Sequence, residues 1–276
     1  MRIKNVFLLI FFTVLTTVSH AQSDFQGVAY YESKTTADMP DFGGRQISEE
    51  QKKRIEERMK SMLEKSYVLT FNRSESLYKE EEKLEAPTQG SGRGFRMMGN
   101  FTSGPQYKNI QTNQWLQDQE FFGKQFLIKD SLPKLTWKME NETKQIGQYT
   151  CFKATAVKII SGSDIRNMRP PRPGDDNKDQ ENQSREITVT AWYTPQIPVN
   201  QGPGEYWGLP GLILEVNADR TAILCSKIVL NAKEKEEIKA PKKGKEVTQE
   251  EYDAIVKKKM EEMREMFQSR RGGGRP

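Results

Sequence analysis

Residues Tyr107–Ile160 read YKNIQTNQWLQDQEFFGKQFLIKDSLPKLTWKMENETKQIGQYTCFKATAVKII. The stretch contains many β-branched and aromatic residues, and turn-forming residues interrupt it at Thr112-Asn113 and Ser131-Leu132-Pro133. Together these features predict a nearly continuous series of strands. The expected strands are Tyr107–Thr112, Gln114–Glu120, Lys124–Lys129, Leu135–Met139 and Gln148–Ile160.

Similar runs on both sides of this stretch extend the series of expected strands. They are Phe25–Lys34, Tyr67–Phe71, Glu75–Tyr78, Glu186–Tyr193, Leu212–Asn217 and Thr221–Leu230. Parallel sheets need helices between consecutive strands, and no such alternation is present here. The sequence therefore predicts a mainly β protein built on an antiparallel sheet.

Four polar segments, residues 38–66, 79–106, 161–185 and 231–276, interrupt or follow the strands. Two of them predict amphipathic helices. The first helix presents Ile55, Met59, Met62 and Leu63, and the second presents Tyr252, Ile255, Val256, Met260, Met263 and Phe267. Each stripe could pack on the sheet, on the other helix or on a partner protein.

Both expected helices begin with a capping box, formed by Ser48 with Gln51 and by Thr248 with Glu251. Val247 and Tyr252 are spaced as a hydrophobic staple around the second box. The other two polar segments contain Gly/Ser-rich or Pro-rich stretches that predict disorder, at Gln89–Gly104 and Met168–Ser184.

The amino terminus predicts export. Basic residues Arg2 and Lys4 precede the apolar run Val6–Val18, and the small residues Ser19 and Ala21 occupy positions −3 and −1 of a cleavage site after Ala21. We therefore expect a signal peptide at residues 1–21, a single β domain at 22–230, and a helix and disordered tail at 231–276. The expected location is the periplasm or cell envelope.

The single histidine of the chain, His20, lies within the expected signal peptide. A mature chain without histidine excludes Ser-His-Asp and Cys-His nucleophiles in their usual form. We accordingly expect a protein that is not an enzyme, with no catalytic residues, no cofactor and no metal site. The formal charge of +5 is small beside 29% charged residues, so no nucleic-acid partner is expected.

Cysteine and methionine residues suggest two further features. Cys151 and Cys225 are the two cysteines of the chain, and in an exported protein they predict a disulfide, with two buried free thiols as the alternative. Met260, Met263 and Met266 place thioethers at helical spacing. Such ligands suit Cu(I), although methionine also fills irregular gaps in cores.

The most distinctive stretch is Trp192–Glu215, WYTPQIPVNQGPGEYWGLPGLILE. Pro210 and Gly211 occupy the central positions that a type II turn requires. The prolines, glycines and aromatic residues predict either a rigid connection that caps the core or an aromatic-lined surface for a ligand or partner. The candidate surface residues are Trp192, Tyr193, Tyr206, Trp207, Leu209 and Pro210.

The segment Gly208–Ile213 reads GLPGLI and resembles the GLPGLI family of exported bacterial proteins. FLIKDSL at Phe126–Leu132, ETKQIGQYTCFKA at Glu142–Ala154 and WYTPQIP at Trp192–Pro198 agree with it. The resemblance implies an envelope protein of Gram-negative bacteria and carries no established activity. The family looks distantly similar to LolA-like half-barrels, which implies a strongly curved antiparallel sheet with helices on its open side, holding acyl chains.

These observations favour an exported, non-enzymatic envelope protein that binds an apolar, lipid-like small molecule or a peptide. We expect one or two amphipathic helices to close the open side of the curved sheet. The alternative is a structural or assembly partner of an outer-membrane machine that docks through its helices. Copper handling through the methionine clusters is a third possibility. No transmembrane segment is expected in the mature chain.

Overall fold

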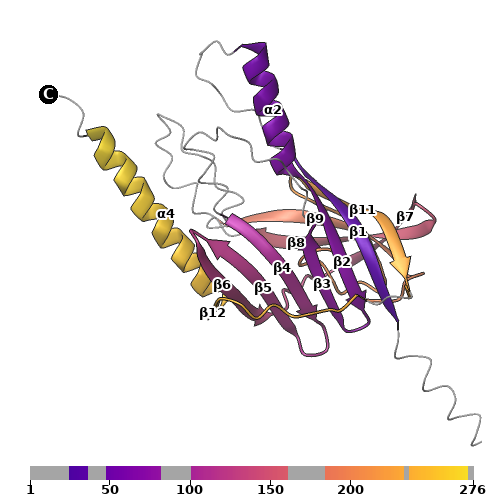
Figure 1. Cartoon of the computed structure of the whole chain (residues 1–276). Coiled ribbons are helices and arrows are strands. Elements are labelled where there is room, and N and C mark those ends of the chain that lie inside the picture. The colour runs from indigo at the N-terminus through magenta and orange to yellow at the C-terminus, as the bar shows by residue number, and fades with distance from the viewer. Residues whose placement is uncertain (1–24, 37–47, 82–100, 161–183, 233–235, 273–276) are drawn as a thin grey trace, which may run out of the picture.

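The computed structural model describes residues 25–36, 48–81, 101–160, 184–232 and 236–272 (Figure 1). The expected signal peptide and His20 lie outside these residues, as do most of the stretches expected to be disordered. The described chain forms one sheet of twelve strands and two helices. The prediction of a mainly β protein is therefore confirmed.

The strands follow one another closely along the chain. They are β1 (Gln26–Thr35), β2 (Glu64–Asn72), β3 (Glu75–Glu80), β4 (Phe101–Asn109), β5 (Gln114–Phe121), β6 (Lys124–Ser131), β7 (Lys138–Ile146), β8 (Tyr149–Ile160), β9 (Arg185–Thr194), β10 (Leu212–Ala218), β11 (Thr221–Leu230) and β12 (Lys245–Val247).

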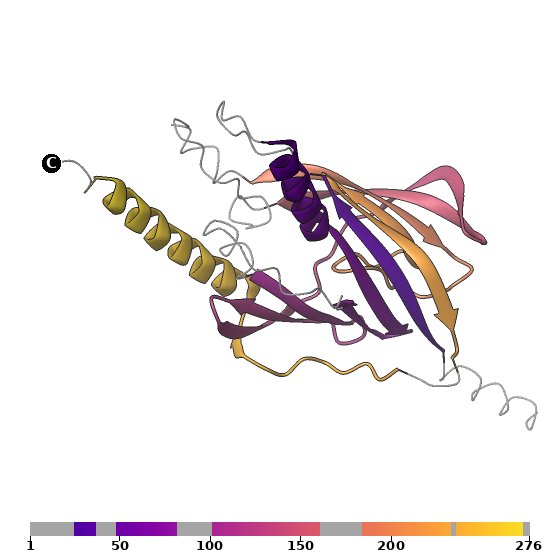
Figure 2. The same cartoon turned by 45° about the horizontal axis from the view of Figure 1, so that its top comes forward.

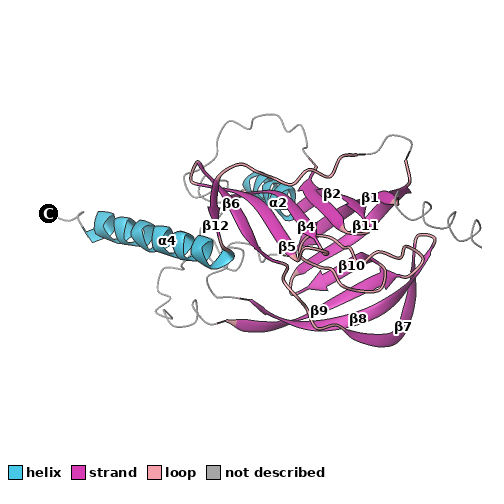
Figure 3. Cartoon of the chain, turned by 90° about the horizontal axis from the view of Figure 1, so that it is seen from below, coloured by secondary structure: helices cyan, strands magenta, loops and turns pink. Residues whose placement is uncertain are grey.

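The sheet order is β12-β6-β5-β4-β3-β2-β1-β11-β10-β9-β8-β7. Neighbouring strands are antiparallel throughout, except that β12 lies parallel to β6. The sheet is curved and is not closed into a barrel, because β12 and β7 end it without pairing with each other (Figure 3). The likeness to LolA-like half-barrels stays a prediction.

Strand β7 differs from the strand expected at Leu135–Met139. Its sequence, KMENETKQI, is polar and mostly exposed, because β7 ends the sheet and has a neighbour on one side. Lys153 of β8 holds it through ion pairs to Glu140 at 3.3 Å and Glu142 at 2.8 Å. Charged side chains and a break in register are common on edge strands, where they discourage pairing with other chains.

The carboxy-terminal segment crosses the outside of the sheet before it joins the far edge (Figure 2). Ile238 and Ala240 pack on a cluster formed by Tyr107, Leu116 and Leu127. Residues 245–247 then add β12 beside β6, a strand that the polar composition of this segment did not predict. Val247 is buried there, which supplies the apolar contact that the short strand needs.

The two helices are α2 (Glu49–Leu63) and α4 (Gln249–Gly272), and both capping boxes are confirmed. α2 extends from the start of β2, with Ile55, Met59 and Leu63 partly buried (Figure 1). The side chains of Met62 and Phe267 are not described.

α4 is anchored at its first turns. Tyr252 and Val256 pack against Phe121, Phe126 and Ile128 of β5 and β6, and the buried Val247 joins the same cluster as expected of a staple. Beyond Val256, no described residue of α4 is buried, and the helix extends away from the sheet (Figure 2). Packing on the sheet is thus the role of the first turns.

We predict that Tyr252→Ala lowers the free energy of unfolding by about 3 kcal/mol, because it removes a buried ring that contacts two other rings. Met266→Ala, on the same helix but 54% exposed, is the matched control and should change it by less than about 0.5 kcal/mol. Urea denaturation of the full chain measures both. Equal effects of the two substitutions would contradict the anchoring of α4 at its first turns.

Candidate functional site

The candidate site is built around the connection between β9 and β10, which we call the β9–β10 loop (residues 195–211). The loop folds back along the start of β10 through backbone hydrogen bonds. The amide of Leu212 donates to the Ile197 carbonyl at 3.0 Å, and that of Ile213 donates to the Gln201 carbonyl at 3.1 Å. These bonds join the loop to the strand that directly follows it in the sequence.

The turn at Leu209–Gly211 is not the expected type II turn. A type II turn needs a positive φ at Gly211, but Gly211 has none; the residue directly before the turn, Gly208, has a φ of 93°. The Gly211 amide instead donates to the Leu209 carbonyl at 2.8 Å, a three-residue turn centred on Pro210. Glycine is required at 211 for space, because a Cβ there would lie 2.2 Å from the Thr194 carbonyl oxygen.

A buried lysine holds the middle of the loop from the opposite part of the sheet. Lys108 of β4 is fully buried, and its Nζ donates to the carbonyls of Gly202 at 2.5 Å, Gly204 at 2.7 Å and Tyr206 at 3.3 Å. Ser76 on the neighbouring β3 donates to Gln201 Oε1 at 2.8 Å. Sequence reasoning missed Lys108, because a lysine within an expected strand gives no signal of burial.

The other end of the sheet holds the same loop. Lys158 of β8 forms an ion pair with Glu205 at 2.6 Å. Trp137, just before β7, donates its indole N–H to the Trp207 carbonyl at 2.9 Å, and Trp207 donates to the Pro133 carbonyl at 2.6 Å. The β9–β10 loop therefore braces the β3–β4 part of the sheet against β8, although β8 is far from them in the sheet order.

Electrostatics set Lys108 apart. Burial lowers the pKa of Lys108 from the usual 10.5 to about 7, and the Glu205 carboxylate acts in the opposite direction. A charged amine is costly to bury unless it is hydrogen-bonded, and here three carbonyl dipoles meet that requirement. A lysine with this pKa changes its charge near neutral pH.

The six predicted surface residues separate into three groups. Tyr193, Tyr206 and Leu209 are buried in one core cluster, as the capping interpretation of this stretch expects. Trp207 is partly buried and Pro210 is exposed, so this part of the predicted surface is accessible. Its role as a ligand or partner surface stays a prediction.

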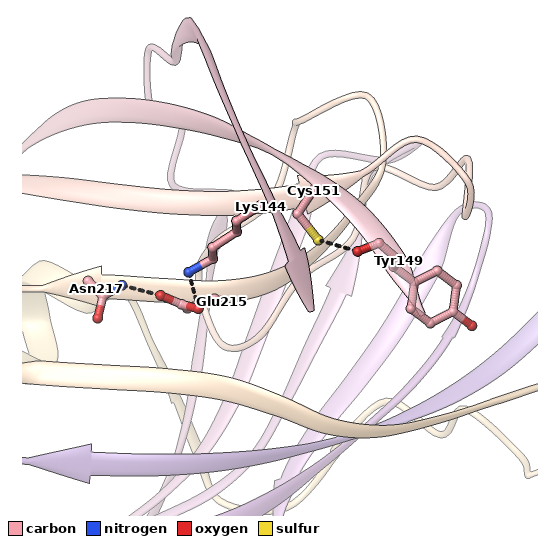
Figure 4. Close-up of polar contacts among 5 residues, drawn as sticks. All are labelled: Lys144, Tyr149, Cys151, Glu215 and Asn217. Carbon is pink, nitrogen blue, oxygen red and sulfur yellow. Dashed lines mark hydrogen bonds and ion pairs between the residues drawn. The ribbon is translucent and has the colours of Figure 1, made fainter. Parts of the chain in front are cut away.

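The sixth predicted surface residue, Trp192, belongs to a separate polar group. Lys144 of β7 lies over the Trp192 ring, 4.3 Å from its centroid. Lys144 also forms an ion pair with Glu215 at 2.5 Å, and Asn217 donates to the same carboxylate at 2.7 Å (Figure 4). This group links β7, β9 and β10 and fixes the edge of the sheet.

The expected disulfide is absent from the structure. Cys151 and Cys225 are free thiols buried in one core cluster, on β8 and β11, with β9 and β10 between them in the sheet order. Each thiol donates to a carbonyl of its own strand, that of Tyr149 at 3.7 Å (Figure 4) and that of Lys227 at 3.6 Å. Burial raises the pKa of Cys151 to about 11 and of Cys225 to about 12, which disfavours the reactive thiolate.

The methionine hypothesis remains a prediction. Met260 and Met263 are partly buried on α4, and Met266 is 54% exposed further along the same helix. Met59 is partly buried on α2. The helical spacing of the α4 methionines is as expected, and copper binding by them is untested.

Comparison with known proteins adds a family match. A family model described as "Protein of unknown function (Porph_ging)" matches residues 137–215, which run from Trp137 through β7, β8, β9 and the β9–β10 loop into β10. The match includes Trp137 and Lys158, which hold the β9–β10 loop on the β8 side. Its description does not carry the GLPGLI name, so that resemblance stays a prediction.

Two solved structures resemble the fold distantly. They are titled "Structure of PNGF-II in C2 space group" and "Structure of PNGF-II in P21 space group", with 14% and 13% sequence identity and a TM-score of 0.45 each. They match 84% and 85% of this chain, which spans 32% and 33% of theirs, about a third of their length. No curated protein matches the chain. No helix among the described residues is long and apolar enough to cross a membrane.

We predict that Lys108 makes stability depend on pH above neutrality. The folded-state pKa of about 7 lies below the unfolded value of 10.5, so above pH 7 the unfolded chain binds more protons than the folded chain. Stability from this group therefore rises with pH between about 7 and 10.5 and is absent below that window. From pH 7 to 8.5 the gain should be about 2 kcal/mol.

The measurement is the unfolding free energy of the wild type minus that of Lys108→Met at each pH. Taking the difference removes the contribution of the cysteines and tyrosines, whose raised pKa values act in the opposite direction at higher pH. A difference that does not change between pH 7 and 8.5 would show that Lys108 is neutral or normally solvated throughout.

Proposed function

We propose that the protein is an exported, non-catalytic binding protein that takes an apolar, lipid-like ligand at the tryptophan surface, defined as Pro133, Trp137, Trp207 and Pro210. The observation that carries the proposal is a pair of hydrogen bonds between residues 133–137 and the β9–β10 loop. The Trp137 indole donates to the Trp207 carbonyl, and the Trp207 indole donates to the Pro133 carbonyl. The signal-like amino terminus and the absence of histidine after residue 20 support export and a non-enzymatic role.

The chemistry of this surface suits an apolar ligand. An indole has one hydrogen-bond donor and no acceptor, and both donors are already used on backbone carbonyls. The remaining ring surface of Trp137 and Trp207 is apolar and only partly buried, beside the exposed Pro133 and Pro210. Ring positions fixed before binding reduce the entropy cost of capture.

The tryptophan surface is held in place by the core cluster beneath it and by backbone hydrogen bonds. Leu209 is fully buried in a core cluster against which Trp137 and Leu135 pack. The Trp207 backbone is fixed on one side by the Trp137 indole and on the other by the Lys108 contact to the preceding Tyr206 carbonyl. Trp137 and Trp207 are therefore held both by the core cluster and by the hydrogen bonds that fix the β9–β10 loop.

We predict that a dansyl-labelled undecanoic acid binds to the full chain and that Trp207→Ala weakens its binding at least about fivefold, since an aromatic anchor at a binding surface contributes more than about 1 kcal/mol. Energy transfer from tryptophan to the dansyl group measures the affinity. Trp192→Phe is the matched control, because Trp192 lies under Lys144 and should leave the affinity unchanged.

Unchanged affinity in Trp207→Ala, with the fold intact by circular dichroism, would exclude the tryptophan surface as the lipid-like site. Binding of a proline-rich peptide in place of the fatty acid, sensitive to the same substitution, would assign the surface to a peptide. Equal weakening by Trp192→Phe would place the site elsewhere on the protein.

A second candidate function is docking on an envelope assembly through α4. It is favoured by the end of the packing contacts at Met260, after which the helix extends away from the sheet with Met263 and Met266 on it (Figure 2). Methionine-rich helix faces suit adaptable apolar contacts with a partner.

For this second function we predict that deletion of residues 261–276 leaves the melting temperature within about 2 °C of the wild type, because the deleted residues carry none of the described buried contacts. A partner that co-purifies with the wild type should rebind the purified wild type but not the truncated chain. Loss of folding on deletion would instead show that the end of α4 packs on the protein itself.

A further inference from the structure

The contacts of Lys108 match its charged form in number. Three carbonyl oxygens, from Gly202, Gly204 and Tyr206, lie within 3.3 Å of Nζ. An ammonium group has three N–H donors and satisfies all of them, whereas a neutral amine has two donors and one lone pair. In the neutral form one carbonyl would therefore face a lone pair instead of a hydrogen.

The Tyr206 carbonyl is the contact that the neutral amine should lose. It is the longest of the three at 3.3 Å, against 2.5 Å and 2.7 Å for the two glycine carbonyls. Trp207 follows directly, and its own carbonyl receives the Trp137 indole. A change at Tyr206 is thus one peptide unit from the tryptophan surface.

The charged and titratable groups around Lys108 are few. The loop contributes Glu205, which Lys158 of β8 pairs at 2.6 Å, and Tyr206. β3 contributes Tyr78, whose pKa is raised by burial, and β5 places the non-titrating Trp115 opposite Lys108 in the register. The described residues include no histidine. We therefore assign to Lys108 the change that we expect near neutral pH in the contacts of the β9–β10 loop.

We propose that Lys108 is a protonation-controlled positioning residue, which as an ammonium fixes the Tyr206–Trp207 backbone and as a neutral amine releases the Tyr206 carbonyl and shifts Trp207. The tryptophan surface is then set in its bound geometry at mildly acidic pH and loosened at mildly alkaline pH. The regulatory meaning of this shift rests on the proposed function, but the shift itself does not.

The test is ¹⁹F NMR of the full chain labelled with 5-fluorotryptophan, carrying His20→Gln, between pH 6 and 9. The resonances of Trp137 and Trp207, assigned with Trp→Phe variants, should follow one-proton curves with a midpoint within about one pH unit of 7. The Trp192 resonance is the internal reference and should stay flat, because its cation partner is Lys144. Lys108→Met should abolish both curves.

Two variants at the partly buried Lys158–Glu205 ion pair test the same proposal without altering Lys108 itself. Glu205→Gln removes the charge that raises the pKa of Lys108, so the midpoint should move to lower pH. Lys158→Met breaks the same Lys158–Glu205 ion pair but keeps the carboxylate, and its midpoint should not fall. These variants decide the question if Lys108→Met fails to fold.

Constant Trp137 and Trp207 resonances across this range would overturn the proposal, as would identical curves in Lys108→Met or an unmoved midpoint in Glu205→Gln. Failure of the proposed function is distinguishable: the resonances then titrate as expected while the dansyl-labelled acid does not bind. Binding that is independent of pH, together with a titrating Trp207, would separate the motion of the loop from ligand affinity.

Discussion

A single buried amine connects two distant parts of this sheet. An open antiparallel sheet has no inherent reason to keep its two ends at a fixed separation, since hydrogen bonds join neighbouring strands only. The β9–β10 loop supplies the missing restraint, and it depends on Lys108 on one side and on the Lys158–Glu205 pair on the other. Two glycines of the loop have separate reasons: a Cβ at Gly202 would lie 2.7 Å from the Tyr206 carbonyl oxygen, and Gly204 has a positive φ of 55°.

The brace also explains why the loop sequence is so unusual. Gly211 touches the Thr194 backbone too closely for any side chain, and Gly208 has a φ angle that favours glycine. Pro210 centres a three-residue turn that leads directly into the buried start of β10. Each of these residues serves the path of the backbone. Trp207 is only partly buried and Pro210 is exposed, so both remain accessible at the surface of the loop.

Much of the fold could be predicted from the sequence, because strands with a buried face carry their own pattern. β1, β8 and β11 lie close to the expected ranges for this reason. β7 could not be placed, since a polar edge strand is defined by its partner and not by its composition. β12 was missed because three residues are too few to show a period.

The candidate site was predictable only in part. The aromatic and glycine residues of the loop were visible in the sequence, but Lys108 was not, because its burial depends on a contact 94 residues away along the chain. The disulfide prediction relied on the expected export of the protein and on the presence of two cysteines. The structure places both cysteines in one buried cluster as free thiols, and each thiol donates to a carbonyl of its own strand.

The sheet order has a consequence for biogenesis. The first strand, β1, lies between β2 and β11, so one of its two edges stays open until residues 221–230 are available, and the outermost strand on the other side, β12, comes later still. A chain synthesised from its amino terminus therefore exposes apolar strands until most of its length is available for pairing.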